Sequence, residues 1–288
     1  MYYKRGALGM KVAIMTDSTT YIPEETRKEL DIHLLPLSVV FEDGAYLEEI
    51  DITTEEFYAK VRASKELPTT SQPSIGVVAN KMEELAKSYD AVISIHLSSG
   101  ISGTYQTVAS SDGMVDGIDV YAYDSEISCM AQGFYVIEAA KMAKKGKSPE
   151  EIIRRLDQMK QSMTAYFMVD DLTNLQKGGR LSGAQAFVGS LLQVKPILHF
   201  VDKKIVPFEK IRTRKKAIRR ILGLLEQDAQ EGKKLRIAFI ATNPEEAKQL
   251  EATFKEKYPD FDTTTSYFGP VIGTHLGEGA IGATWYEM

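Results

Sequence analysis

The sequence has few of the residues that build disulfide frameworks or metal centres. Its 288 residues include one cysteine, Cys129, and four histidines. A single cysteine excludes a disulfide within the chain, and scattered histidines lack the ligand spacing of a zinc site. We therefore expect no metal ion and no resident cofactor. The cysteine content fits a reducing compartment, and the cytoplasm is the expected location.

The sequence also lacks an excess of basic residues and a long apolar run. The formal net charge is −5 and the pI is about 5.6. Nucleic-acid binding needs clustered Lys and Arg, so this balance argues against a nucleic-acid partner. No run reaches the roughly 18–20 apolar residues of a membrane span. Residues 1–9 are basic without the apolar segment of a signal peptide, and we interpret them as a loose extension or an artefact of the assigned start.

The first half alternates between apolar runs and helix-start signals. Strands are predicted at residues 11–15, 34–41, 91–96 and 119–123. Helix starts are predicted at Pro23, at the capping-box pairs Thr53 with Glu56 and Ser148 with Glu151, and at the N-cap Ser74. Alternation of this kind favours a parallel sheet covered on both faces. We predict an N-terminal α/β domain over residues 10–163, with a mostly parallel sheet flanked by helices.

The second half has a different pattern, which predicts a C-terminal mixed α/β domain over residues 164–288. Strands are predicted at residues 165–169, 197–201, 204–208, 236–241, 263–268 and 281–286. One helix is predicted over residues 214–230 and another after the cap at Asn243. A glycine-rich loop, residues 269–282, is expected between the last two strands.

Hydroxyl-rich segments stand at several predicted element ends. Residues 16–20 (TDSTT) follow the first strand, where α/β proteins bind ligands, but they equally suit a capped turn. Residues 68–74 (PTTSQPS) combine four hydroxyls with two prolines that keep the backbone extended. Residues 98–105 (SSGISGTY) open a helix with glycines and exposed amides, which favours an anion. Neither the dinucleotide fingerprint nor the P-loop is present, so the anion is expected to be a carboxylate or a non-nucleotide phosphate.

Two further segments combine glycines with a chemically versatile side chain. In residues 176–182 (QKGGRLS), Arg180 could bind an anion bidentately or pair with Asp170 or Asp171. In residues 269–282, five glycines surround His275. A lone histidine is commonly structural, but this glycine-rich setting favours ligand contact.

The residues give little support to a catalytic role. The Gly-x-Ser-x-Gly elbow of a hydrolase is absent, and no cluster supplies metal ligands. Two alternatives stay open on the residues alone. One is an enzyme acting on a small phosphate- or carboxylate-bearing substrate through residues 98–104. The other is an interaction module in which the basic stretch from Arg212 to Arg220 binds an acidic partner.

Taken together, seven segments resemble the DegV family, whose best-described members are the FakB fatty-acid-binding proteins of bacteria. The matching segments are residues 16–19, 70–74, 98–106, 177–182, 194–197, 211–214 and 274–282. They occur in the family's order and extend over essentially residues 10–288.

The resemblance implies a two-domain α/β fold that holds a long-chain fatty acid in a buried tunnel. It implies that Thr70, Ser102 and His275 bind the carboxylate, with Arg180 and Arg212 near the head group or a partner. The family's members present the fatty acid to a separate fatty acid kinase and carry the acyl phosphate for phospholipid synthesis. The chain would then be a carrier and no enzyme, with transient contact to a membrane surface. Apolar residues that follow the Gly-Gly-Arg segment are candidates for the tunnel lining, and each of them equally suits an ordinary core: Phe187, Val188, Leu191, Leu192 and Ile197.

Overall fold

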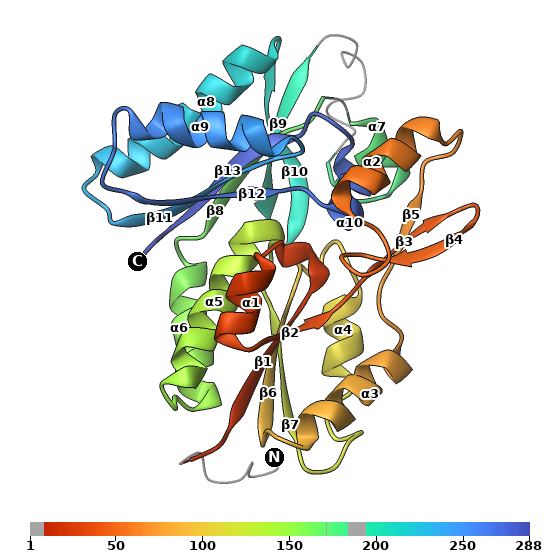
Figure 1. Ribbon diagram of the computed structural model, residues 1–288. Helices are drawn as coiled ribbons and strands as arrows, with labels where there is room; N and C mark the ends of the chain where they lie inside the picture. The colour runs from red at the N-terminus through yellow and green to blue at the C-terminus, as the bar shows by residue number, and fades with distance from the viewer. Residues whose placement is uncertain (1–8, 171, 184–193) are drawn as a thin grey trace.

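Three β-sheets organise the chain in the computed structural model, which describes residues 9–170, 172–183 and 194–288 (Figure 1). The strand orders are β2-β1-β6-β7, β10-β9-β8-β13-β11-β12 and β4-β3-β5. The first sheet is parallel throughout, and the second mixes antiparallel with parallel pairs. The predicted α/β class is therefore confirmed. The domain boundary near residue 163 stays a prediction.

The four-stranded sheet has helices on both faces. Its strands are β1 (Val12–Asp17), β2 (Ile32–Leu35), β6 (Ala91–His96) and β7 (Asp119–Asp124). The helices of this half are α1 (Glu24–Leu30), α2 (Thr54–Ala63), α3 (Ile75–Ala86), α4 (Thr104–Ala109), α5 (Cys129–Lys144) and α6 (Pro149–Lys160). Side chains alternate along β1, so that Ala13 and Met15 pack with α3 while Ile14 packs toward α5. Figure 1 shows α3 and α4 on one side of the sheet and α1, α5 and α6 on the other.

The predicted helix starts of this half are observed. Thr53 and Ser148 each accept a hydrogen bond from the backbone of the N3 glutamate, which bonds back to the cap residue. Ser74 caps α3 by accepting from the amide of Val77. Each cap satisfies a backbone group that has no partner within its helix.

The six-stranded sheet is covered on one face by two long helices. Its strands are β8 (Thr164–Met168), β9 (Lys195–Val201), β10 (Lys204–Ile211), β11 (Leu235–Ala241), β12 (Asp262–Tyr267) and β13 (Ile281–Glu287). Helices α8 (Arg214–Gln230) and α9 (Pro244–Lys255) bury Ile221 and Phe254 against this sheet. The opposite face turns toward the first half, and Leu198 and Ile240 share a core cluster there with Phe134 of α5. One continuous apolar core thus joins the two larger sheets.

The prediction of one strand over residues 34–41 is wrong. The chain forms β2 and then β3 (Ser38–Phe41), and the two strands belong to different sheets. Pro36 lies between them and has no amide hydrogen to continue a ladder. β3 pairs antiparallel with β4 (Gly44–Leu47) and β5 (Thr69–Ser71), which form a small third sheet.

The prediction of a glycine-rich loop over residues 269–282 is also wrong in part. Residues Pro270–Leu276 form helix α10, which contacts α2, β3, β5 and the short helix α7 (Thr173–Lys177). A 3₁₀ helix, η1 (Ser18–Thr20), follows β1. Among the described residues, no helix is both long enough and apolar enough to cross a membrane.

Candidate functional site

A cavity of about 240 Å³ brings together four of the five residues that the sequence singles out. Thr70, Ser102, Arg180 and His275 all line it. Most of the remaining wall is apolar and comes from both halves of the chain, including Leu37, Leu97, Ile101, Phe167, Ile240 and Phe268. Segments that lie more than 200 positions apart in the sequence therefore form one chamber.

Thr70 and His275 are in direct contact. The Nε2 atom of His275, on α10, lies 2.9 Å from the Oγ1 atom of Thr70, on β5. Burial lowers the pKa of His275 to about 4, and the positive charge of Arg180 adds to the effect. The imidazole is consequently neutral at physiological pH, so that one ring nitrogen donates a hydrogen bond and the other accepts one.

Gly178 leaves the space that the imidazole occupies. A Cβ atom at this position would lie 2.5 Å from the Nδ1 atom of His275. Gly178 ends α7 with ordinary helical φ and ψ, so its lack of a side chain matters for space and not for backbone conformation. The first glycine of the Lys-Gly-Gly-Arg segment thus serves to seat His275.

Arg180 connects the two sides of the polar cluster. Its Nε atom donates to the carbonyl oxygen of Ile101 at 3.3 Å, beside Ser102, and its Nη1 atom donates to the carbonyl oxygen of Gly178. Asp170 pairs instead with Lys195 and Arg214, so the alternative of an Arg180–Asp170 pair is wrong. Asp171 lies outside the described residues.

The segment that carries Ser102 is held by a turn from the six-stranded sheet. The hydroxyl of Ser98 donates to the carbonyl oxygen of Lys203 at 2.6 Å, and the Nζ atom of Lys203 lies 3.0 Å from Asp124 Oδ2. Lys203 sits in the β9–β10 turn with a φ of 70°. A Cβ atom on Gly100 would overlap the carbonyl group of Lys203, so only glycine allows this close approach. Ser102 itself bonds to Thr104, with 2.9 Å between the hydroxyl oxygens.

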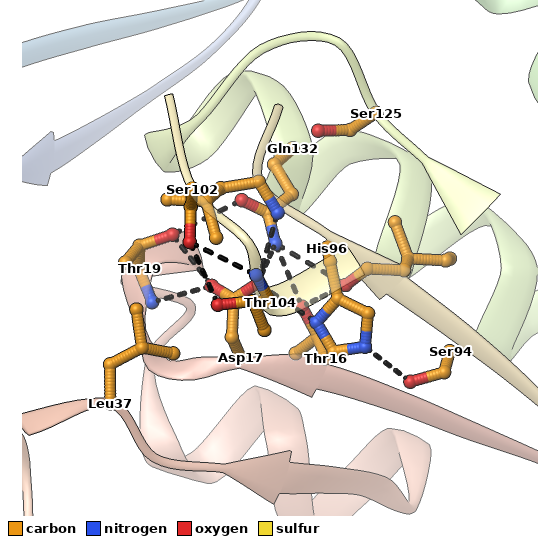
Figure 2. Close-up of polar contacts among 12 residues, drawn as sticks. Thr16, Asp17, Thr19, Leu37, Ser94, His96, Ser102, Thr104, Ser125 and Gln132 are labelled. Atoms are coloured by element: carbon orange, nitrogen blue, oxygen red, sulfur yellow. Dashed lines mark hydrogen bonds and ion pairs between the residues drawn. The ribbon is translucent and has the colours of Figure 1, made fainter. Parts of the chain in front are cut away.

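A buried polar network lies below this segment and is centred on Asp17 (Figure 2). Asp17 accepts hydrogen bonds from the amides of Thr19 at 3.0 Å and Leu97 at 2.9 Å, and from Gln132 at 3.1 Å. Burial raises the pKa of Asp17, but the interactions with His96 and the hydrogen bonds from Thr19 and Leu97 together outweigh burial and leave the pKa below its usual value. Of the two alternatives for residues 16–20, a ligand-binding segment or a capped turn, the structure shows the capped turn. Asp17 also anchors the backbone that leads to Ser102.

Within this network a serine, a histidine and an aspartate are hydrogen-bonded in the same order as the residues of a hydrolase triad. Ser94 Oγ lies 2.5 Å from His96 Nε2, and His96 Nδ1 lies 3.0 Å from Asp17 Oδ2. All three residues have 0% exposure, and none of them lines the cavity. A nucleophile must reach its substrate, so this triad acts as a structural network and does not support the enzyme hypothesis.

The remaining predicted residues lie elsewhere. Arg212 is exposed in a separate surface groove with Lys216, Arg219 and Arg220. Ile197 was expected in the lining but is buried in the core beneath α8. The other expected lining residues, Phe187, Val188, Leu191 and Leu192, lie outside the described residues. Within the described ranges, no group of three or more His, Cys, Asp or Glu side chains could hold a metal ion.

Sequence patterns missed much of the apolar wall. Leu37, Leu97 and Ile240 follow the ordinary alternation of buried strands and strand ends, which does not distinguish a cavity wall from a packed core. The Asp17–His96–Gln132 network was missed as well, because its members come from three separate segments.

Comparison with known proteins identifies the family. Residues 11–288 match the family described as "Uncharacterised protein, DegV family". Protein DegV of Bacillus subtilis (strain 168) is 60% identical over 278 residues, which cover 96% of this chain and 99% of that protein. The chain belongs to the DegV family, as the resemblance of its seven segments indicated.

Solved structures share the fold. The crystal structure of DegV from Bacillus subtilis, described as a fatty acid binding protein, has a TM-score of 0.92 and 59% identity, covering 97% of this chain and 100% of that one. A fatty acid binding DegV family protein from Streptococcus agalactiae has a TM-score of 0.89 and 32% identity over 97% of this chain and 100% of its own.

Proposed function

We propose that the chain binds a long-chain fatty acid, with the carboxylate at Thr70, Ser102 and His275 and the acyl chain along the apolar wall. One observation carries the proposal: a single cavity combines a hydroxyl–imidazole pair, a second hydroxyl and a guanidinium with a mostly apolar lining. The fatty acid binding described for DegV of Bacillus subtilis, which shares the fold at 59% identity, supports it.

The polar groups suit a carboxylate. A buried carboxylate must be hydrogen-bonded or neutralised, because water no longer solvates it. The hydroxyls of Thr70 and Ser102 can donate to its oxygens, and the neutral imidazole of His275 can orient the Thr70 hydroxyl from 2.9 Å. Arg180 adds a positive charge beside Ile101 without an acidic partner among the described residues.

The apolar wall suits an acyl chain. Each buried methylene contributes about 0.8 kcal/mol, so a chain of about 16 carbons contributes on the order of 10 kcal/mol before the costs of binding. Leu37, Leu97, Ile240 and Phe268 offer such a surface from both halves of the chain.

In the finer form of the proposal, the protein is a cytoplasmic carrier for a separate fatty acid kinase and catalyses nothing itself. It presents the carboxylate, receives the acyl phosphate and delivers it for phospholipid synthesis. The absence of a P-loop from the sequence supports a division of labour in which the partner binds the nucleotide. The exposed groove around Arg212 offers cationic side chains for such a partner or for a membrane surface.

The test is to identify what the purified protein contains and binds. The protein is denatured and extracted, and the extract is analysed by mass spectrometry, while delipidated protein is titrated with palmitate and oleate. We expect a stoichiometric acyl species and saturable binding, which Ser102→Ala weakens while the melting temperature is kept. No extracted lipid together with no binding of either acid would overturn the proposal. Turnover of an acyl substrate by the protein alone would overturn its non-catalytic part.

A further inference from the structure

A buried carboxylate, that of Glu48, lies at the first turn of α10 and outside the cavity that Thr70 and His275 line. Glu48 follows β4 and has 0% exposure. It accepts hydrogen bonds from the hydroxyl of Ser18 at 2.5 Å, the hydroxyl of Tyr21 at 3.0 Å and the amide of Val271 at 2.8 Å. A glutamate side chain is seldom buried so completely unless hydrogen bonds satisfy its oxygens.

Glu48 and Tyr21 supply the N-terminal cap that α10 lacks in its own sequence. The residue before α10 is Gly269, which has no side chain to cap the helix. Glu48 accepts from the amide of Val271, and the Tyr21 hydroxyl accepts from the amide of Ile272 at 3.3 Å. These first-turn amides have no partner within the helix. Residues more than 220 positions away in the sequence therefore satisfy them.

Two glycines bring α10 into close contact with the first half. A Cβ atom on Gly269 would overlap the ring of Tyr21, and one on Gly273 would overlap the hydroxyl of Tyr58. The Tyr58 hydroxyl also donates to the carbonyl oxygen of Phe268 at 3.0 Å. Side chains of the first half thus fix the position of α10 along its length.

Helix α10 forms part of the cavity wall. Val271, Ile272, His275 and Leu276 all line the cavity, so each turn of this short helix faces it. Val271 and His275 are four positions apart, which places them about one helical turn from each other. A displacement of the first turn is therefore transmitted to the imidazole that contacts Thr70.

We propose that Glu48, together with Tyr21, is a positioning residue that sets α10 so that His275 meets Thr70. The inference rests on the proposed function of that site, since it assigns Glu48 a part in holding the carboxylate-binding group. Glu48 does not line the cavity and acts on the ligand only through the helix.

A double-mutant cycle tests whether Glu48 acts through His275. Palmitate affinity is measured for the wild type, Glu48→Ala, His275→Ala and the double variant. We expect Glu48→Ala to weaken binding about tenfold alone but less than about twofold in the His275→Ala background, because coupled residues are not additive. Glu48→Gln, which keeps an acceptor for Val271, is expected to restore most of the affinity. An equal loss in both backgrounds would overturn the proposal.

A matched control and a second variant make the result specific. Glu49→Gln changes the neighbouring carboxylate, which bonds to Arg27 and Tyr267 and not to α10, and it is expected to keep wild-type affinity. Where Glu48→Ala does not fold, Tyr21→Phe removes only the hydroxyl that accepts from Ile272 and serves in the same cycle.

A readout without ligand separates this proposal from the proposed function. The ring ¹⁵N resonances of His275, assigned by their loss in His275→Ala, are compared in delipidated proteins. We expect Glu48→Ala to shift them and Glu49→Gln to leave them unchanged. If the wild type binds no fatty acid while Glu48→Ala shifts the resonances, the proposed function fails and the positioning role stands. Unchanged His275 resonances in Glu48→Ala overturn the positioning role, whatever the binding result.

Discussion

The Nε2 atom of His275 lies 2.9 Å from the Oγ1 atom of Thr70, although 205 positions separate the two residues. One atom belongs to a strand of the small third sheet and the other to a helix near the carboxyl end. The contact gives the site a polar centre made of two groups that can both hydrogen-bond to a carboxylate.

Thr70→Val tests the hydroxyl of this pair. Valine keeps the shape of threonine and removes its hydrogen bond, and a hydrogen bond to a charged group contributes about 1.5–3 kcal/mol. Palmitate affinity is therefore expected to fall by a factor of about 10–100, as measured by isothermal titration calorimetry. The matched control is Thr69→Val on the same strand, because Thr69 is exposed and does not line the cavity. Equal affinities for the two variants would contradict the assignment of Thr70.

Gly178→Ala tests the space behind the imidazole. The added methyl group would lie 2.5 Å from His275 Nδ1, so the ring must move away from Thr70. We expect a loss of palmitate affinity of about tenfold or more, with near-wild-type circular dichroism. In the control Gly76→Ala the new Cβ atom meets no atom within 4 Å, so palmitate binding should stay unchanged. The free energy of unfolding should rise by up to about 1 kcal/mol, because alanine restricts the unfolded chain more than glycine does. Unaltered binding by Gly178→Ala would show that the ring tolerates the displacement.

Gly100→Ala tests the contact between the Ser102 segment and the β9–β10 turn. The new Cβ would overlap the carbonyl group of Lys203, and overpacking of this kind costs about 1–3 kcal/mol. Urea denaturation should show that loss in the free energy of unfolding, together with weaker fatty acid binding. Gly223→Ala, where a Cβ meets nothing within 4 Å, provides the control. A Gly100→Ala protein as stable as Gly223→Ala would argue against tight docking of the turn.

Glu48 is expected to make stability depend on pH. Burial raises the pKa of Glu48 from 4.5 to about 7, and the neighbouring charge of Glu49 adds to this rise. The hydrogen bond from Ser18 lowers the pKa but does not outweigh burial. Tyr21 and Cys129 are the other titratable groups that interact with Glu48. The folded state therefore binds the proton more tightly than the unfolded state does. The stabilising contribution of Glu48 is complete below pH 4.5 and is lost as the pH rises through about 7. The free energy of unfolding falls by about 3 kcal/mol in total over this range.

Urea denaturation of the wild type and Glu48→Gln between pH 5 and pH 8 checks this expectation. The difference between the two proteins isolates Glu48, because the lowered pKa of His275 acts in the opposite direction and is common to both. Glu48→Gln should gain stability relative to the wild type as pH rises. Parallel curves for the two proteins would exclude an elevated pKa at Glu48.

Local signals were sufficient for much of the fold. The capping boxes at Thr53 and Ser148 predicted two helix starts, and helix α8 has the predicted bounds. Such signals depend on residues a few positions apart, so the sequence displays them directly. Thr70, Ser102, Arg180 and His275 do line one cavity, but it was the family resemblance that grouped them.

The two errors have physical causes in how strands and helices find their partners. Helix α10 was predicted as a loop because its cap comes from Glu48 and its glycines serve close contacts with Tyr21 and Tyr58. The split between β2 and β3 at Pro36 likewise depends on which sheet accepts each strand. The cap of α10 lies more than 220 positions away and leaves no local pattern in the sequence, whereas Pro36 is a local signal that the apolar run around it concealed.

The place of β13 in its sheet has a consequence for how the sheet is assembled. β13 lies between β8 and β11 and pairs antiparallel with both of them. In the described part of the chain, β8, β9 and β10 on one side are joined to β11 and β12 on the other only through β13. Until β13 inserts, β8 and β11 each present an unpaired edge, which is prone to aggregation. The same insertion brings Gly282, Ala283 and Thr284 into the cavity wall, so the sheet and the chamber are completed in one step.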